Sequence, residues 1–137
     1  MNTIQDQLLR DESLKLKPYK DSVGKLTIGV GRNLDDVGIS KTEAQFLLAS
    51  DIQNAENQLE EALPWTGGLD RIRYYALVNM TFNLGIGRLT EFHDFLAKMQ
   101  TQDWQGASAA MLDSLWARQV GPRAQRLALQ IQTGDWQ

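Results

Sequence analysis

The chain has 137 residues and a formal net charge of −3, with 42% hydrophobic and 23% charged residues, which are proportions typical of one globular domain. It contains no cysteine and a single histidine, His93, which excludes disulfides, zinc-thiolate sites and histidine-pair metal motifs. The acidic excess argues against nucleic acid as a partner, because phosphate binding usually requires a basic surface.

A short amphipathic helix is predicted at the N-terminus. Apolar side chains at i, i+4 spacing place it over residues 4–16, and Pro18 ends it. Glu12 falls on the apolar face of this helix, near its C-terminal end. The first seven residues contain no basic segment followed by an apolar run, and no stretch is long and apolar enough to cross a bilayer. We therefore expect neither a signal peptide nor a membrane span.

A small β-hairpin is predicted over residues 18–34. Asp21 opens a segment of turn-forming residues, and apolar residues then alternate with Thr27, Gly29 and Gly31. The face of the hairpin that carries Thr27 and the two glycines is open to close approach by a ligand, because glycine has no side chain.

The rest of the chain, from Ser40 onward, is predicted to be helical. A capping box over 40–43 begins a long helix that Pro64 ends, and a second long helix is expected over 68–85. Shorter helices follow, and their expected starting points are Glu91, Asp103, Ser114 and Pro122. The predicted architecture is mostly α, with one small antiparallel sheet near the N-terminus.

Several common site motifs are missing from the sequence. The glycines at 29 and 31 lack the third glycine and the βαβ unit of a nucleotide-binding loop. No G-x-S-x-G elbow occurs. The acidic turn at 35–38 lacks the spacing and the terminal glutamate of an EF-hand calcium loop. The carboxylates of Glu12 and Asp21 remain as the candidates for catalysis.

Glu12 and Asp21 are expected in unlike environments. Burial at a helix C-terminus favours the protonated form of Glu12, whereas an exposed turn leaves Asp21 charged. One protonated and one charged carboxyl group is the combination that glycoside hydrolysis requires. Thr27, across the hairpin from Asp21, is placed to hold a water molecule between them. On these residues alone, a helix-end glutamate with a satisfied partner remains the alternative.

The spacing of these three residues is specific. Eight residues separate Glu12 from Asp21, five separate Asp21 from Thr27, and Ile-Gly-Val-Gly follows directly over 28–31. This pattern resembles the catalytic signature of the phage-type lysozymes, or endolysins, of glycoside hydrolase family 24. The likeness resumes in family order at further segments, which are 76–85, Trp104, 114–116, 122–126 and 133–136. It therefore covers almost the whole chain.

The resemblance implies an α+β, mostly helical, two-lobed lysozyme-like fold with a small N-terminal β-hairpin lobe and a larger helical lobe. It implies a single catalytic domain over 1–137. Within it, about 13–60 would form the β-hairpin lobe with the connecting helix, and 1–12 plus 61–137 would form the helical lobe.

The resemblance also implies the reaction, which is hydrolysis of the β-1,4 bond between N-acetylmuramic acid and N-acetylglucosamine in peptidoglycan, with lysis of the host cell. Glu12 would protonate the leaving oxygen, while Asp21 and Thr27 would support the developing charge and the attacking water. No metal or organic cofactor is expected. The expected partner is the glycan strand, not nucleic acid, and the protein is expected to be a monomer that waits in the host cytoplasm until the inner membrane is permeabilised.

Substrate-binding positions are carried over from the family in the same way. Phe82 matches an aromatic residue that lines the cleft, and Asn33 stands where the family often has leucine. Arg123 and Arg126 match arginines that the family places near its active-site acids. The family often has serine and asparagine at two other cleft positions, which here are Phe95 and Ala110.

Arg32 stands where the family commonly has a histidine, so the histidine–carboxylate contact of the family is lost or replaced. The family's carboxylate matches Asp51, which we expect to pair with Arg32. Two alternative functions remain open. A lytic transglycosylase on the same fold would form an anhydro product without adding water, and a non-catalytic wall-binding protein would use the scaffold without chemistry.

Overall fold

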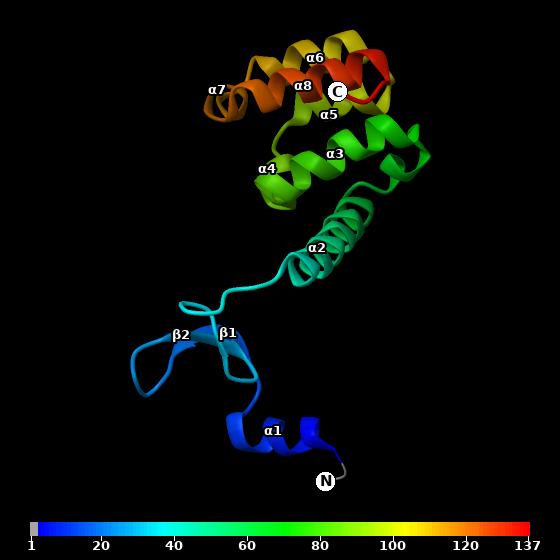
Figure 1. Ribbon diagram of the computed structural model, residues 1–137. Coiled ribbons are helices and arrows are strands. Elements are labelled where there is room, and N and C mark those ends of the chain that lie inside the picture. Colours follow the sequence, from blue (N-terminus) through cyan, green and yellow to red (C-terminus); the bar gives the residue numbers. More distant parts are fainter. Residues whose placement is uncertain (1–2) are drawn as a thin grey trace. The chain divides into compact units, whose positions relative to one another are not determined.

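The computed structural model describes residues 3–137, and it divides the chain into two compact units over 1–47 and 48–137 (Figure 1). The first unit contains a short helix, a small antiparallel sheet and the first residues of a long helix, and the second unit is helical. The predicted mostly helical α+β fold is therefore confirmed. No helix within residues 3–137 has the length and apolar character needed to span a bilayer.

The first unit begins with α1 (Ile4–Glu12), which Thr3 caps through a hydrogen bond from the Asp6 N–H to its hydroxyl. Three strands follow, β1 (Lys15–Lys20), β2 (Leu26–Gly29) and β3 (Arg32–Asn33). They form an antiparallel sheet in the order β1-β2-β3, with Thr27 opposite Tyr19 on one side and Asn33 on the other.

The prediction that the first helix continues to residue 16 is wrong. It ends at Glu12, where Ser13 adopts φ 66° and donates its N–H to the Leu9 carbonyl. Residues 15–20 form β1, so Pro18 lies in a strand and does not end a helix. Proline is tolerated there because β1 is an edge strand, where a missing N–H need not break the ladder.

The next helix, α2 (Lys41–Ala62), begins with the predicted capping box. The Ser40 N–H donates to Glu43 Oε1 at 2.9 Å, and the Glu43 N–H donates to Ser40 Oγ at 3.1 Å. The chain passes from the first unit to the second within this helix, at residues 47 and 48.

The second unit continues as a set of helices joined by short turns. After the 3₁₀ helix η1 (Pro64–Gly68), these are α3 (Arg71–Leu84), α4 (Ile86–Leu89), α5 (His93–Gln100), α6 (Trp104–Leu112), α7 (Leu115–Val120) and α8 (Pro122–Thr133). Helix α6 packs against α5 and α8, and α8 also packs against α3 and α7. These contacts build the apolar core.

The helix boundaries of the second unit follow the local sequence signals. Asp103 and Ser114 cap α6 and α7 through their side chains, and Gly134 closes α8 at φ 74°. Helix α3 begins at Arg71 because residues 64–68 form a separate 3₁₀ turn, and Asp70 caps it. The four-residue helix α4 was not predicted.

Candidate active site

Glu12 is the last residue of α1 and lies against the turn between β2 and β3. A Cβ atom at Gly31 would lie 2.8 Å from Glu12 Oε2 and 3.0 Å from its Cδ, so the carboxylate packs directly onto the Gly31 backbone. Among residues 3–137, the Glu12 side chain has no hydrogen-bond or ion-pair partner.

The expected burial of Glu12 is not found within its own unit. Glu12 is exposed there, and no residue of α1 is buried. Residues 3–47 bury no apolar side chain, so this unit offers α1 no apolar layer to pack against. Contact with Gly31, not desolvation, is what this unit provides for the Glu12 carboxylate.

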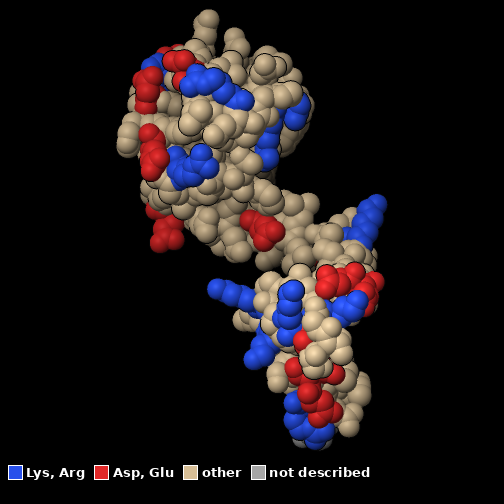
Figure 2. Space-filling view, turned by 90° about the vertical axis from the view of Figure 1, so that its left-hand side faces the viewer, with Lys and Arg blue, Asp and Glu red and all other residues tan. Residues whose placement is uncertain are grey.

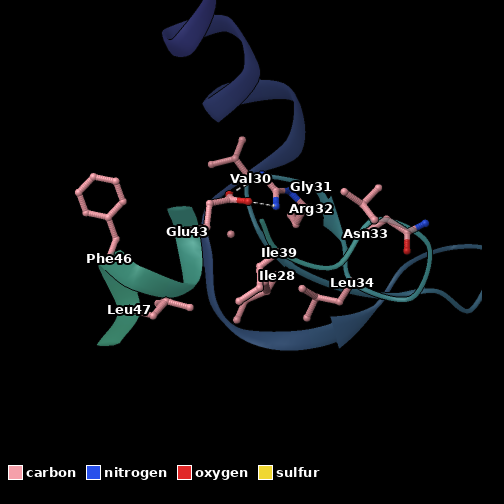
Figure 3. A pocket seen from close by; sticks show the side chains of 12 residues that line it. Ile28, Val30, Gly31, Arg32, Asn33, Leu34, Ile39, Glu43, Phe46 and Leu47 are labelled. Carbon is pink, nitrogen blue, oxygen red and sulfur yellow. Dashed lines mark hydrogen bonds and ion pairs between the residues drawn. The ribbon is translucent and has the colours of Figure 1, made fainter. Parts of the chain in front are cut away.

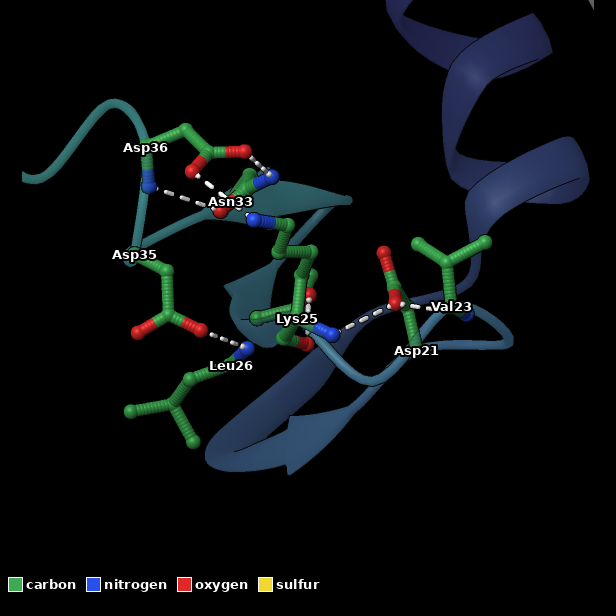
Figure 4. Close-up of polar contacts among 8 residues, drawn as sticks. Asp21, Val23, Lys25, Leu26, Asn33, Asp35 and Asp36 are labelled. Atoms are coloured by element: carbon green, nitrogen blue, oxygen red, sulfur yellow. Dashed lines mark hydrogen bonds and ion pairs between the residues drawn. The ribbon is translucent and has the colours of Figure 1, made fainter.

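Asp21 and Thr27 are joined through the backbone of one residue, Lys25, and Figure 4 shows Asp21 bound to this residue. Asp21 Oδ1 accepts the Lys25 N–H at 2.8 Å, and the Thr27 hydroxyl donates to the Lys25 carbonyl at 2.9 Å. The same carbonyl accepts the Asp21 N–H at 2.9 Å, and Asp21 Oδ1 also accepts the Val23 N–H at 3.0 Å. The β1–β2 turn and the start of β2 thus hold a carboxylate and a hydroxyl at the backbone N–H and carbonyl of one residue, Lys25.

The two side chains differ in exposure. Asp21 is half-buried, and its Oδ2 receives no hydrogen bond from residues 3–137. Thr27 is only 3% exposed, at the centre of the three-stranded sheet. Its hydroxyl proton is used by the Lys25 carbonyl, so the hydroxyl oxygen is left to accept a further hydrogen bond.

The acidic turn after β3 is built into the sheet. Asp35 Oδ2 accepts the Leu26 N–H at 2.7 Å, and Asp36 Oδ1 pairs with Lys25 Nζ at 3.1 Å (Figure 4). The Asn33 amide donates to Asp36 Oδ2 and accepts the Asp36 N–H. The side chain of Asn33, a predicted substrate-binding residue, is therefore already used within its own turn. In the described part of the chain no acidic cluster fits a metal ion.

Arg32 pairs with Glu43, so the expectation of Asp51 as its partner is wrong. Its Nη1 and Nη2 donate to Glu43 Oε1 and Oε2 at 2.9 and 2.7 Å, and Nη1 also donates to the Gly38 carbonyl at 3.0 Å. The hydrogen bond from Arg32, aided by those from Ser40, lowers the pKa of Glu43 to about 2. Glu43, and not Asp51, is the partner of Arg32 because the turn before α2 brings the N-terminus of this helix to β3.

The Arg32–Glu43 pair lies at the edge of an apolar groove of about 980 Å³ in the first unit (Figure 3). Figure 3 shows Arg32 and Glu43 reaching toward each other beside the turn that carries Val30 and Gly31. The remaining wall is mostly aliphatic and aromatic, and it includes Ile28, Leu34, Ile39, Phe46 and Leu47.

The other predicted substrate-binding residues belong to the second unit. Phe82 on α3 is 46% exposed and lines a groove of about 360 Å³ together with Arg123, Tyr75 and Trp136. Arg123 donates to Asn79 Oδ1 from Nε at 3.0 Å and from Nη2 at 2.7 Å.

The Tyr75 and Trp136 rings stack with their centroids 5.8 Å apart, which gives this groove an aromatic wall. Arg126 is exposed and shares with Arg123 a smaller polar pocket of about 280 Å³. Arginine and aromatic side chains thus meet on one surface of the second unit.

Charge is distributed unequally between the units. Residues 1–47 contain seven basic and seven acidic residues, whereas 48–137 contain seven basic and ten acidic residues. Figure 2 shows basic and acidic side chains interspersed on one face of each unit. The net charge of −3 therefore belongs to the second unit, and the unit that carries Glu12 and Asp21 is neutral.

A small antiparallel sheet with carboxylates at its turns, together with a helical unit, is the α+β architecture expected of a lysozyme-like fold. The sequence profile of the phage lysozyme family matches residues 10–130. The chain therefore belongs to the phage lysozyme family and is a glycosidase of the lysozyme class, for which peptidoglycan is the implied substrate.

Individual relatives agree with this assignment. Probable T4-type lysozyme 1 of Dictyostelium discoideum is 28% identical, over 98% of this chain and 96% of its own length. The endolysin of Acyrthosiphon pisum secondary endosymbiont phage 1 is 30% identical, over 83% of this chain and 78% of its own. The pre-baseplate central spike protein Gp5 of Enterobacteria phage T4 is 30% identical over 97% of this chain, which spans only 28% of that protein.

Two contacts at the site were not predicted from the sequence. Glu43 was recognised as a capping residue but not as the partner of Arg32, because that pairing depends on the path of the loop over 34–40. The contact between Gly31 and Glu12 was missed for a similar reason. The glycine in the signature was the available signal, since a glycine with positive φ often marks close approach of another group.

Proposed function

We propose that this protein hydrolyses the β-1,4 bond between N-acetylmuramic acid and N-acetylglucosamine in peptidoglycan, and so lyses the host cell. The observation that carries the proposal is the binding of the Asp21 and Thr27 side chains to the backbone of the same residue, Lys25, in the unit that also presents Glu12. Membership of the phage lysozyme family supports the same reaction.

Glu12 is assigned the role of general acid. A general acid must be within reach of the oxygen that it protonates, and no hydrogen bond or ion pair within residues 3–137 occupies the Glu12 carboxyl group. The side chain still needs a fixed direction, and contact with Gly31 limits where its carboxylate can lie. Glu12 would protonate the glycosidic oxygen as the bond to the leaving sugar breaks.

Asp21 and Thr27 are assigned to the other face of the reacting sugar. The free Oδ2 of Asp21 is available to accept a proton from water or to stabilise positive charge at the anomeric carbon. The Thr27 hydroxyl oxygen is available to accept a hydrogen bond from the same water. Because Thr27 is almost fully buried, a water at its hydroxyl would be confined, which favours a defined direction of attack.

Sugar contacts are proposed for the aromatic groove and the polar pocket of the second unit. Phe82 offers an exposed ring for the apolar face of a pyranose, and Arg123 and Arg126 offer donors for hydroxyl, acetamido or lactyl oxygens. Asn33 is proposed to contact the glycan through the backbone of its turn, since its amide is bound to Asp36.

The products distinguish this proposal from its alternatives. Purified peptidoglycan would be digested and its fragments analysed by mass spectrometry and reducing-end assay. Hydrolysis predicts disaccharide-based fragments with a reducing muramic acid end. Fragments lighter by one water, with no new reducing end, would indicate a lytic transglycosylase. Binding to peptidoglycan with no fragments released would indicate a wall-binding protein.

A further inference from the structure

Arg32 is held at three points on the loop and helix that follow it. Both guanidinium Nη atoms donate to the Glu43 carboxylate, at 2.9 and 2.7 Å, and Nη1 also donates to the Gly38 carbonyl. Such a fork requires the planar, two-sided donor set of arginine, which the single ammonium of lysine does not provide. The direction of the Arg32 side chain is therefore fixed.

Glu43 is itself anchored independently of Arg32. Its Oε1 accepts the Ser40 N–H at 2.9 Å, and its own N–H donates to Ser40 Oγ at 3.1 Å. The carboxylate thus belongs to the N-terminal cap of α2, which is a rigid element. Arg32 consequently connects the β2–β3 turn to the start of α2.

That turn touches the Glu12 carboxylate. Gly31, the residue before Arg32, would place a Cβ 2.8 Å from Glu12 Oε2. Gly29 has almost the same φ, 70° against 71°, but a Cβ there would meet nothing within 4 Å. Of these two neighbouring glycines, only Gly31 is in contact with the carboxylate.

We infer that Arg32 is a positioning residue for the proposed reaction, because its forked ion pair with Glu43 holds the turn on which Gly31 seats the Glu12 carboxylate. This inference rests on the proposed function, in which Glu12 is the acid. The Arg32–Glu43 pair affects the orientation of the Glu12 carboxyl group and does not contact the substrate.

The first experiment measures kcat and KM for reducing-end release from solubilised peptidoglycan. Arg32→Met and Glu43→Gln each break the fork, and Gln at this position preserves the capping box. Each variant is expected to lower kcat by about tenfold to a hundredfold with KM little changed, as misplacement of a catalytic group does. The double variant should be no worse than the more damaging single one, because both changes remove the same pair. Arg32→Lys should recover part of the loss.

The matched control is Lys98→Met. It also removes a cation that pairs with a carboxylate at 2.7 Å, in this case Asp94 in α5 of the second unit. It should leave kcat and KM unchanged. If Arg32→Met fails to fold, Glu43→Gln decides the outcome, because it retains the cap of α2.

The second experiment compares Gly31→Ala with Gly29→Ala. Both glycines have a positive φ that alanine rarely adopts, so each change is expected to lower Tm. Only the alanine at 31 collides with the Glu12 carboxylate, so only Gly31→Ala should lower kcat strongly. Adding Arg32→Met to Gly31→Ala should then have little further effect on kcat.

Glu12→Gln distinguishes the positioning role of Arg32 from the proposed function. If Glu12→Gln is inactive while Arg32→Met and Glu43→Gln retain the kcat of the parent protein, the positioning role is overturned and the proposed function stands. If Glu12→Gln remains active, both are overturned. An inactive Glu12→Gln, with reduced kcat and unchanged KM in the two fork variants, supports the inference.

Discussion

Residues 3–47 bury a single side chain, that of Thr27, whereas all the buried apolar side chains of residues 3–137 lie in 48–137. The first unit is organised by polar contacts at its turns, around Lys25 and between Arg32 and Glu43. The second is organised by helices packed around a continuous apolar core. The two units of one chain are thus stabilised by different forces.

Because of this difference, we expect activity and stability to depend on different residues. Exposed hydrogen bonds and ion pairs contribute little free energy each, because water competes for the same groups. The burial of large apolar side chains contributes far more. We therefore expect substitutions in the first unit to change the reaction with small effects on unfolding, and substitutions in the core of the second unit to do the reverse.

The largest expected effect on stability is that of Leu77→Ala. Leu77 in α3 is fully buried, and its truncation would lose transfer free energy and leave a cavity, which costs about 2–5 kcal/mol of unfolding free energy. Leu129→Ala in α8 is the control, because Leu129 is 45% exposed. Denaturant unfolding measures both variants. Equal losses would contradict the assignment of the core, and loss of activity in folded Leu77→Ala would contradict the separation of roles.

The next effect concerns the polar cluster of the first unit. Asp21→Asn and Thr27→Ala are each expected to lower the rate, because both side chains are assigned to one water. If they act in the same step, the double variant should be little worse than the more damaging single one. Rates of peptidoglycan hydrolysis for the three variants test this. Fully multiplicative losses would indicate that the two residues act separately.

A third effect appears at alkaline pH in the second unit. Burial, with smaller contributions from Glu56 and Glu60, raises the pKa of Tyr74 to about 12. Because the folded state favours the neutral phenol, its contribution to stability is complete below pH 10 and is lost as pH rises toward 12. Tyr74→Phe should therefore show a smaller fall in Tm over this range than the parent protein. Tyr19→Phe is the control, and an equal fall in all three proteins would refute the prediction.

The smallest effect is expected at acidic pH in the first unit. The Arg32 hydrogen bond is the main cause that holds the pKa of Glu43 at about 2. The contribution of this carboxylate is present above its ordinary pKa of 4.5 and is lost as pH falls toward 2. In Arg32→Met the pKa of Glu43 should rise toward its ordinary value. Carboxyl chemical shifts followed through the acid range would test this, and an unchanged titration would show that Ser40 alone sets the pKa.

The sequence predicted the features that depend on neighbouring residues. The starts of α2, α6 and α7 are set by capping side chains, and the hairpin turn at Asp21 is set by turn-forming residues, so local chemistry was sufficient. These predictions needed no knowledge of which elements pack together.

The features that were missed depend on residues farther along the chain. Pro18 was interpreted as a helix end, because nothing local shows that residues 15–20 pair with β2. Arg32 could not be paired with Glu43 without the path of the loop between them. Family resemblance supplied Glu12, Asp21 and Thr27 as a set, and the structure adds how the last two are joined at Lys25.

We expect the first unit to carry the chemistry through Glu12, independently of the apolar core. Glu12→Gln keeps the shape of the side chain and removes its acidic proton. The lytic rate and the Tm of this variant would be measured together. Asp11→Asn, at the neighbouring carboxylate, is the control. We expect a rate lower by about a hundredfold to ten-thousandfold with an unchanged Tm. A lytic rate close to that of the parent protein would contradict it.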